Sequence, residues 1–575
     1  MASDRPASEP GWAVTALGLA VVWLLAAGLL AGQAASLLAG RGAARLLGGA
    51  GLAAAAVYVR GLDHAFDPAP PSWLFWPLLV LLWVGPLAGA LRLWVRFGYG
   101  TAPTGARWGG RRTERQLHAP EDPLQRVDRM AAGRGKATGK VLAGKPCISA
   151  TVFGNPGAGK TSGLGLPIAA EWQGPLVATT VKASDFDTIY ARRAELGPVW
   201  VIAPAGLPDR ETACWSPVDY CVDARASDRM AGWLADAAVT AGDQRAAPWV
   251  EQAKYVLKGI LLAAYLSEGG ITAFRRWLTL GEAAVDDVRS ILADAGYKEV
   301  ADDYVGPFQL HDDGIGSVKF TLATIARVYA DEEVRAAAAR SDFTAEEFLD
   351  RCGTICLIAS ETDAERYAPL LTAITASVVH AAQTRYKETG KPLSPALGLV
   401  VDEAGNMFRY PALPRLLTSG RGMGIAALTI WHDFSQLISV LGREAANTVV
   451  SASGMRMLLP GNGDLETLQL FSRLFGRAEV TKTSTTYSSG SVSRSEQTVE
   501  TDLAPIHYLQ QLPDHTAVLQ YGNLPPLHID LRRTYADRDL IALLNRKQKQ
   551  TPAVPAPARP AKDTATGADL TKTTR

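Results

Sequence analysis

The chain has 575 residues, a formal net charge of +1 at pH 7 and 20% charged residues. This length predicts three to five folded units and a core large enough to surround a ligand. The near-neutral net charge excludes a protein that binds nucleic acid through a strongly basic overall charge, so any such binding would depend on local basic patches. The five cysteines are odd in number and scattered, which excludes a disulfide scaffold and predicts reduced, mostly buried thiols.

Residues 1–97 predict a transmembrane anchor of two helices, at about 12–38 and 72–95. The first run is apolar and uncharged, and at roughly 1.5 Å per residue it is long enough to cross a bilayer. The second is bordered by Trp73 and Trp76 at its start and by Trp94 at its end, as expected for interfacial anchors. The alternatives are a cleaved signal peptide for the first run and a buried core helix for the second.

Arginines crowd the side that follows the second predicted helix, which marks that side as cytoplasmic. Two crossings then return the N-terminus to the cytoplasm and leave a short external loop near 60–71. The Ala/Gly-rich run 46–59 could add a third crossing, which would place the N-terminus outside, but its short length and small residues favour an extension of the first hairpin or an interfacial segment.

Residues 98–145 are rich in Arg, Gly and Lys and predict a basic linker that leads into the first strands of the next domain. Residues 147–161, CISATVFGNPGAGKT, then match the P-loop pattern G-x-x-x-x-G-K-[ST]. The glycines let backbone amides approach phosphate, Lys160 would contact the β- and γ-phosphates, and the Thr161 hydroxyl would ligate Mg²⁺. The candidate nucleotide-binding residues are Gly154, Asn155, Pro156, Gly157, Ala158, Gly159, Lys160, Thr161 and Ser162.

Alternating strand and helix patterns after the P-loop predict an α/β fold with a parallel sheet. We assign residues 146–218 and 386–544 to this nucleotide-binding domain. The intervening residues 219–385 show helical periodicity and predict a mainly all-α insertion, from which a strand near 354–359 returns to the sheet.

The run Leu397-Gly-Leu-Val-Val-Asp402-Glu403 is an apolar strand that ends in two acids, which is the Walker B arrangement. The Mg²⁺ held by Thr161 needs a carboxylate from a neighbouring strand, and Asp402 would supply it. Glu403 would polarise the attacking water. An ordinary acidic strand end is the alternative.

Several further segments carry a family resemblance, namely Asp402-Glu-Ala-Gly-Asn-Met, Leu413 to Ala426 with its Ser-Gly-Arg421-Gly, Gln436-Leu and Ala446 to Gly454. Together with the P-loop and the anchor, they resemble the type IV secretion coupling proteins, the TraG/TraD-like DNA-transfer ATPases of conjugation. The resemblance runs from the P-loop to about Tyr535.

The resemblance implies a RecA-like P-loop ATPase that uses ATP and Mg²⁺, assembles as a homo-hexamer in the bacterial plasma (inner) membrane as a multi-pass protein, and keeps its ATPase domain cytoplasmic. It implies single-stranded DNA with its relaxase, and type IV secretion channel proteins, as partners. Arg421 resembles the arginine that reaches a neighbouring subunit's γ-phosphate. His432 stands where family members usually have a Gln that senses this phosphate, so weak hydrolysis is one expectation.

Two segments near the C-terminus are less informative. The Ser/Thr-rich run 482–498 predicts an exposed hairpin or loop, and residues 545–575 predict a disordered tail. Two other functions remain open: a chromosome-partitioning DNA translocase, and a nucleotide-binding docking receptor that hydrolyses little.

Overall fold

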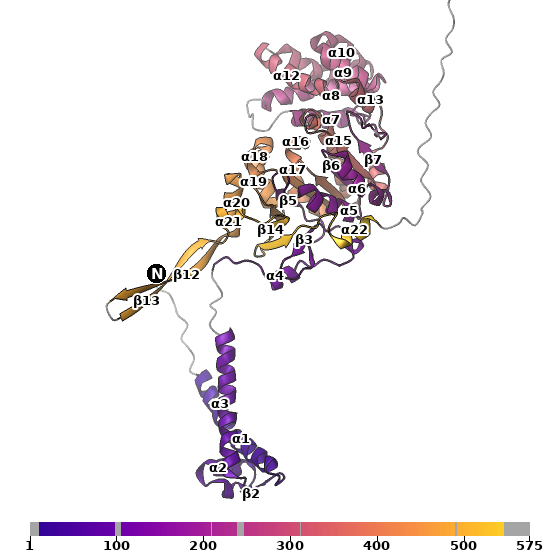
Figure 1. Cartoon of the computed structure of the whole chain (residues 1–575). Coiled ribbons are helices and arrows are strands. Elements are labelled where there is room, and N and C mark those ends of the chain that lie inside the picture. Colours follow the sequence, from indigo (N-terminus) through magenta and orange to yellow (C-terminus); the bar gives the residue numbers. More distant parts are fainter. Residues whose placement is uncertain are drawn as a thin grey trace, which may run out of the picture. The chain divides into compact units, whose positions relative to one another are not determined.

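The computed structural model describes residues 11–97, 105–208, 210–238, 247–310, 312–488 and 491–545. The chain divides into two units, Met1–Thr104 and Gly105–Arg575, which are described separately (Figure 1). Almost all of the tail predicted to be disordered, 545–575, lies outside the described residues.

The N-terminal unit is built from three helices and a short ribbon. These are α1 (Gly11–Leu38), β1 (Arg45–Leu46), α2 (Ala50–Val59), β2 (Phe66–Asp67) and α3 (Ser72–Phe97). The buried face of α1 carries Ala27, Ala31 and Ala35 at a spacing of four, so neighbouring elements approach it closely. A Cβ on Gly32 would lie 2.1 Å from the ring of Phe66, which shows how tight this packing is.

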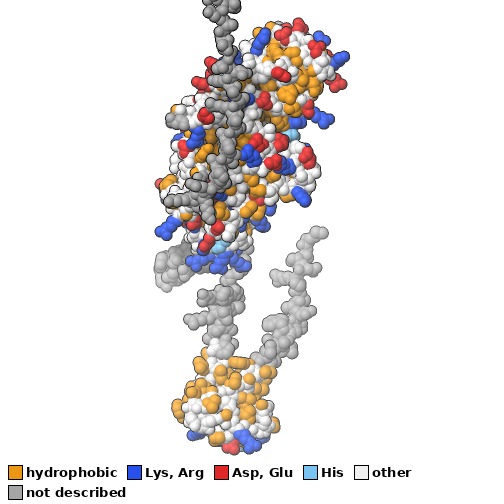
Figure 2. All heavy atoms as spheres, turned by 90° about the vertical axis from the view of Figure 1, so that its right-hand side faces the viewer, with side chains coloured by type: hydrophobic (Ala, Val, Ile, Leu, Met, Phe, Trp, Pro, Cys, Tyr) orange, Lys and Arg blue, Asp and Glu red, His pale blue; other side chains and the backbone are white. Residues whose placement is uncertain are grey.

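On the face of this unit that Figure 2 shows, many of the side chains are hydrophobic, and the charged ones gather at its lower end. Among residues with described side chains, one helix is long and apolar enough to cross a membrane, α1 over Val21–Leu38, with a mean hydropathy of 1.9. The described apolar part of α3, Ser72–Gly85, is shorter. Both predicted helices form where expected, and the second crossing stays a prediction. The ten residues of α2 span only about 15 Å, too little for a third crossing.

The second unit is organised around an eleven-stranded sheet. From one edge to the other, its strands are β4 (Val141–Ala143), β3 (Ala131–Gly135), β15 (Leu527–Asp530), β14 (Thr516–Tyr521), β11 (Met455–Leu458), β5 (Ala150–Phe153), β10 (Ile425–Trp431), β9 (Leu397–Val401), β6 (Leu176–Thr180), β8 (Thr354–Ile358) and β7 (Val199–Ile202). The strands from β11 to β7 are parallel, and those from β14 to β4 pair antiparallel. The predicted α/β class is therefore confirmed.

Two hydrophobic cores cover the two faces of the sheet. Along β10, Ile425 and Ala427 belong to one core, and Ala426, Leu428 and Ile430 belong to the other. Because successive side chains alternate across a strand, a strand buried on both faces is expected to be mostly apolar, and the exception in this strand, Thr429, has its hydroxyl 3.3 Å from that of Thr151. Figure 1 shows helices on both sides of the strands.

The second core is covered by three helices, α5 (Leu166–Glu171), α6 (Ala183–Ala194) and α22 (Arg538–Leu544). The first core is covered by α15 (Ala364–Thr389), α16 (Ala404–Met407), α17 (Leu413–Met423), α18 (Phe434–Leu441), α19 (Arg443–Ala452) and α20 (Leu465–Phe475). Two further helices are short. Helix α4 (Arg111–Arg115) precedes β3 in the chain, and α21 (Ile506–Gln510) lies between β13 and β14 and packs against α20.

In the part of the chain between β7 and β8 that the structure describes, eight α-helices are found. They are α7 (Ala224–Ala238), α8 (Ala247–Leu266), α9 (Gly270–Leu280), α10 (Val285–Asp294), α11 (Lys298–Val305), α12 (Asp312–Val328), α13 (Glu332–Ala337) and α14 (Ala345–Asp350). Helix α15 follows β8 and packs against α7, so it belongs to the packing of both regions. The domain boundaries given above for the insertion stay a prediction.

The predicted Ser/Thr-rich segment is a long antiparallel hairpin of β12 (Arg477–Ser488) and β13 (Ser491–Asp502). Figure 1 shows it projecting from the end of α20 and away from the sheet.

A buried ion cluster joins the start of this unit to its end. Arg126 donates to Oε1 of Glu171 at 2.6 Å, and Nη1 of Arg532 forms an ion pair with the same oxygen at 2.7 Å. Glu171 is the last residue of α5, the helix that follows the P-loop. Asp537 accepts from Arg134 at 2.8 Å and lies 3.3 Å from Arg532. The cluster therefore ties the linker, the P-loop helix and the C-terminal segment together.

We expect Glu171→Gln to lower the free energy of unfolding by about 3–5 kcal/mol, since the substitution leaves the buried guanidinium group of Arg126 without its ion-pair partner and leaves Arg532 paired with Asp537 alone. Burial already lowers the pKa of Arg126, and the charge of Glu171 opposes that shift. The shift in denaturant midpoint of the nucleotide-binding unit's unfolding measures the effect. The matched control is Asp342→Asn, which breaks the exposed pair with Arg340 and should change little. Equal shifts in both variants would contradict the expectation.

Candidate functional site

The P-loop follows β5, as predicted. Gly157 and Gly159 have φ angles of 82° and 83°, a left-handed conformation that glycine adopts without steric cost. Gly154 is required for another reason, because a Cβ there would lie 2.9 Å from Cβ of Leu459. The loop closes into a single π-helical turn, Thr161–Gly165, which leads into α5.

Three parallel strands deliver the predicted site residues to one edge of the sheet. The P-loop follows β5, His432 follows β10, and Asp402 with Glu403 follows β9. We expected the acidic strand to be a neighbour of β5, but β10 lies between them. The carboxyl ends of parallel strands share an edge, so the acids still reach the P-loop.

Lys160 and Glu403 form an ion pair at the centre of the site. The distance from Lys160 Nζ to Glu403 Oε1 is 3.0 Å, and that from Nζ to His432 Nδ1 is 3.1 Å. The other ring nitrogen of His432, Nε2, lies 2.9 Å from Glu403 Oε2. His432 is therefore placed where it contacts both the lysine and the acid, at the position predicted for a phosphate sensor.

The backbone of Glu403 is itself unusual. Its φ of 51° places a non-glycine residue in the left-handed region, which costs of the order of 1–3 kcal/mol and is seen most often at functional sites. This conformation begins α16 and accompanies the contacts of Glu403 with Lys160 and His432.

These contacts determine the charge of Glu403. Burial alone would raise its pKa, but the hydrogen bond from His432 and the charge of Lys160 outweigh burial and lower the pKa to about 2. Glu403 is therefore a carboxylate across the physiological range. A carboxylate with so low a pKa is a weak proton acceptor while Lys160 stays beside it.

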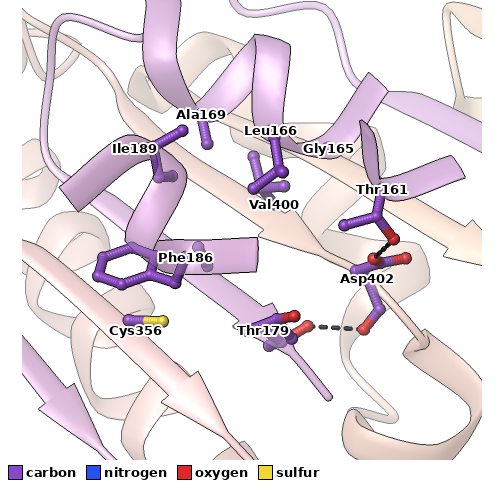
Figure 3. A pocket seen from close by; sticks show the side chains of 12 residues that line it. Thr161, Gly165, Leu166, Ala169, Thr179, Phe186, Ile189, Cys356, Val400 and Asp402 are labelled. Atoms are coloured by element: carbon purple, nitrogen blue, oxygen red, sulfur yellow. Dashed lines mark hydrogen bonds between the residues drawn. The ribbon is translucent and has the colours of Figure 1, made fainter. Parts of the chain in front are cut away.

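Asp402 is arranged differently. It is 4% exposed, accepts a hydrogen bond from Thr161 Oγ1, and its backbone carbonyl accepts one from Thr179 Oγ1 at 2.7 Å (Figure 3). Burial raises the pKa of Asp402, and the hydrogen bond from Thr161 opposes this. Among the described residues, no cationic side chain forms an ion pair with Asp402.

These residues fit a bound Mg²⁺. The ion prefers oxygen ligands, and it is commonly held by one or two carboxylates together with phosphate oxygens. Thr161 and Asp402 present a hydroxyl and a carboxylate within hydrogen-bonding distance of each other. A buried carboxylate without a cation in contact is the group that a divalent ion would stabilise.

The space beside Asp402 is a small cavity of about 20 Å³ between α5, α6 and the sheet. Figure 3 shows its mostly apolar wall, which includes Leu166, Phe186, Ile189 and Val400. This wall accounts for the burial of Asp402 on the side away from the P-loop.

Arg421 does not join the site. It is exposed in the last turn of α17, ahead of β10, whereas His432 follows the opposite end of that strand. Seven strand residues at about 3.3 Å each place the two ends of β10 roughly 23 Å apart. Arg421 therefore cannot contact the nucleotide of its own P-loop.

The sequence analysis missed three residues that support the predicted ones, Gly461, Asn462 and Thr534. Asn155 donates to the carbonyl of Gly461 at 2.7 Å, and Asn462 donates to the carbonyl of His432 at 3.1 Å. The carbonyl of Ser162 accepts from the amide of Thr534 at 3.1 Å. The Gly461-Asn462 pair after β11 predicts a turn. Its contacts with Asn155 and His432, however, depend on which strands are neighbours in the sheet, and the local sequence does not show this.

The sheet and the site together define a P-loop nucleotide-binding protein of RecA-like type. Residues 121–556 match the family described as Type IV secretory system Conjugative DNA transfer. The chain belongs to this family, which confirms the resemblance found in the sequence.

Proteins of similar sequence support the assignment of the chain to this family. The protein VirD4 of Agrobacterium fabrum is 24% identical over 423 residues, which cover 70% of this chain and 60% of VirD4, and VirD4 of Rhizobium rhizogenes matches equally. The chain thus spans about 60% of the length of these curated relatives.

Among solved structures, the bacterial conjugative coupling protein TrwBdeltaN70 in its unbound monoclinic form has a TM-score of 0.56 at 17% identity, over 74% of this chain and 92% of TrwB. TrwB in complex with ADP and Mg²⁺ has a TM-score of 0.54 at 17% identity, over 75% and 95%. At these identities the likeness shows the fold, which confirms the predicted fold class.

Proposed function

We propose that the chain is a membrane-anchored, Mg²⁺-dependent ATPase that recruits single-stranded DNA with its relaxase and moves the DNA through a type IV secretion channel during conjugation. The observation that carries the proposal is the meeting of Lys160, Thr161, Asp402 and Glu403 at one edge of the sheet. The complex of TrwB with ADP and Mg²⁺ supports the choice of nucleotide and metal.

The P-loop backbone binds the phosphates and Lys160 contacts the terminal ones. Thr161 and Asp402 hold Mg²⁺, which neutralises charge on the phosphates. Glu403 orients the attacking water, and His432 senses the γ-phosphate from between Lys160 and Glu403.

Nucleotide binding has to open the ion pair seen in the structure. Lys160 cannot contact a phosphate and keep its full interaction with Glu403, so the triphosphate competes with the acid for the ammonium group. When Lys160 moves toward the phosphate, the pKa of Glu403 rises and the acid becomes a better proton acceptor. Binding thereby activates the residue that hydrolysis needs.

The proposed location is the bacterial inner membrane with the ATPase on the cytoplasmic side. It is supported by the apolar exposed surface of the N-terminal unit and by α1, which is long enough to cross. We propose that α3 makes a second crossing, that copies assemble as a homo-hexamer, and that channel proteins of the secretion system bind this assembly.

We expect His432→Ala to lower kcat about tenfold, since it removes the contacts with both Lys160 and Glu403. In His432→Gln, by contrast, the amide can still donate to Glu403 and most of kcat should be retained. Steady-state ATP hydrolysis by the two variants measures the difference. Equal loss in both would contradict a sensing role for the ring.

Arg421 is proposed to act on the nucleotide of a neighbouring copy, because it lies too far from its own P-loop. We expect Arg421→Ala and Glu403→Gln to be inactive as separate preparations. Mixed assemblies regain part of the turnover, since some interfaces then combine an intact Arg421 with an intact Glu403. Hydrolysis rates as a function of mixing ratio test this, and no recovery at any ratio would contradict action between copies.

The experiment that tests the whole proposal uses the full chain in detergent micelles. Mg²⁺-dependent ATP hydrolysis should rise when single-stranded DNA is added, and chelation of Mg²⁺ should abolish it. The docking receptor remains the second candidate because the low pKa of Glu403 makes it a weak base. ATP binding without turnover, unimproved by His432→Gln, would favour the receptor. Turnover that responds only to double-stranded DNA would instead favour the chromosome-partitioning translocase.

A further inference from the structure

The segment that follows β15, residues 531–537, lies on the first turn of the helix behind the P-loop. Strand β14 pairs antiparallel with both β11 and β15, and β11 is parallel to β5, so β15 runs in the same direction as β5. The carboxyl ends of β15 and β5 therefore share the edge of the sheet that carries the P-loop. At that edge the amide of Thr534 donates to the carbonyl of Ser162 at 3.1 Å, and a Cβ on Gly163 would lie 3.1 Å from Cβ of Leu531.

Contacts on both sides of this segment fix its position. Arg532 is buried and pairs with Glu171, the last residue of α5, at 2.7 Å. Asp537 accepts from the amide of Leu540 at 3.2 Å and so caps the start of α22. Between these two anchors the chain makes a turn, in which the amide of Asp537 donates to the carbonyl of Arg533 at 2.8 Å. The turn is therefore held against the helix that follows the P-loop.

Two side chains of this turn remain accessible. Tyr535 is 64% exposed, although the residue before it, Thr534, is bonded to the P-loop helix. The guanidinium carbon of Arg533, which is half-buried, lies 5.3 Å from the centre of the Tyr535 ring. An aromatic ring and a planar cation thus flank the residue that contacts Ser162.

The order of the strands determines which way a bound nucleotide points. Glu403 and His432, proposed to act at the terminal phosphate, follow β9 and β10, which lie on one side of β5. The amides at the start of the helix behind Lys160 hold the α- and β-phosphates. Because the nucleoside is attached to the α-phosphate, it leaves the site on the side away from Glu403 and His432. Strand β15 lies on that side of β5, and the segment after it reaches Ser162.

We propose that the nucleobase stacks on the ring of Tyr535, which Arg533 holds in place. Bases stack on aromatic side chains, and a guanidinium group adds to such a stack. Stacking recognises the planar face that every base has and not a pattern of hydrogen bonds, so the substrate class is purine nucleoside triphosphates and not ATP alone. This inference rests on the nucleotide binding proposed above, but it requires neither hydrolysis nor DNA.

The first test compares ADP with inorganic pyrophosphate, which lacks the nucleoside, as ligands of the full chain in detergent micelles with Mg²⁺. Tyr535→Ala should weaken the binding of ADP and of GDP about tenfold each and leave pyrophosphate affinity unchanged. Tyr535→Phe keeps the stacking face and should keep normal ADP affinity. The matched control is Tyr255→Ala, since Tyr255 lies on α8 and is 42% exposed. It should affect neither ligand.

Three outcomes of this test would overturn the proposal. The first is unchanged ADP affinity in Tyr535→Ala. The second is an equal loss for ADP and pyrophosphate, because Tyr535 would then support the P-loop turn and not the base. The third is an equal loss of ADP affinity in Tyr535→Phe, because the hydroxyl and not the ring face would then make the contact.

The second test locates the base with 2-azido-ADP, which carries its photoreactive group on the adenine. After irradiation and digestion with trypsin, the label should lie on the peptide Thr534–Arg538, and excess ADP should prevent labelling. Label that excess ADP prevents but that lies only on other peptides would overturn the proposal. Failure of the proposed function shows separately, as absence of ATP turnover in an unmodified chain that still binds ADP through Tyr535.

Discussion

Replacing Lys160 by Ala is expected to lower kcat/KM for ATP about 10³-fold. The substitution removes the ammonium group that forms an ion pair with Glu403, and this is also the charge proposed to face the terminal phosphates. Loss of a single group that stabilises developing charge costs about 10²–10³ in rate. Here a second effect adds to the first, since Glu403 loses its counter-charge and then repels the triphosphate.

The measurement is steady-state hydrolysis by the full chain, with ATP binding followed in parallel. The matched control is Lys182→Ala. Lys182 follows β6 at the same edge of the sheet, yet the hydrogen bonds that the structure describes for it are made by its backbone, with the hydroxyl of Thr180 and the amide of Asp185. It should keep near-normal turnover. A Lys160→Ala chain that hydrolyses ATP as fast as Lys182→Ala would refute the role given to the P-loop.

The site could be predicted where it depends on local pattern. A glycine-rich loop that ends in Lys160 and Thr161 commonly binds nucleotide phosphates. A buried strand that ends in Asp402 and Glu403 adds the carboxylates that such a site needs. Parallel strands bring their carboxyl ends to one edge, so the meeting of these residues follows from the α/β pattern alone.

What could not be predicted depends on strand order. The position of β10 between β5 and β9 places His432 between Lys160 and Glu403, and nothing in the local sequence of residues 425–432 indicates this order. Arg126, Glu171 and Arg532 are far apart in the chain, so their buried cluster has no local signature.

Replacing Glu403 by Gln should lower kcat about 10²–10³-fold while ATP binds at least as tightly as before. The amide keeps nearly the size of the acid but cannot accept a proton, and general bases contribute about 10²–10⁴ in rate. Binding should not weaken, because the neutral amide competes less for Lys160 than the carboxylate does. Hydrolysis and equilibrium ATP binding, measured on the same preparation, separate the two effects. The matched control is Glu466→Gln, an acid paired with Arg443 on the surface.

The same variant tests the charge of Glu403 through its dependence on pH. The folded-state pKa of about 2 lies below the ordinary value of 4.5, so the ionised acid stabilises the fold above about pH 4.5, and this contribution is lost as the pH falls toward 2. The wild-type chain should therefore be more stable than Glu403→Gln by a constant margin from pH 5 to 8, and the margin should shrink below pH 4.5. A margin that grows on acidification would mean that Lys160 and His432 do not hold the acid in its charged form.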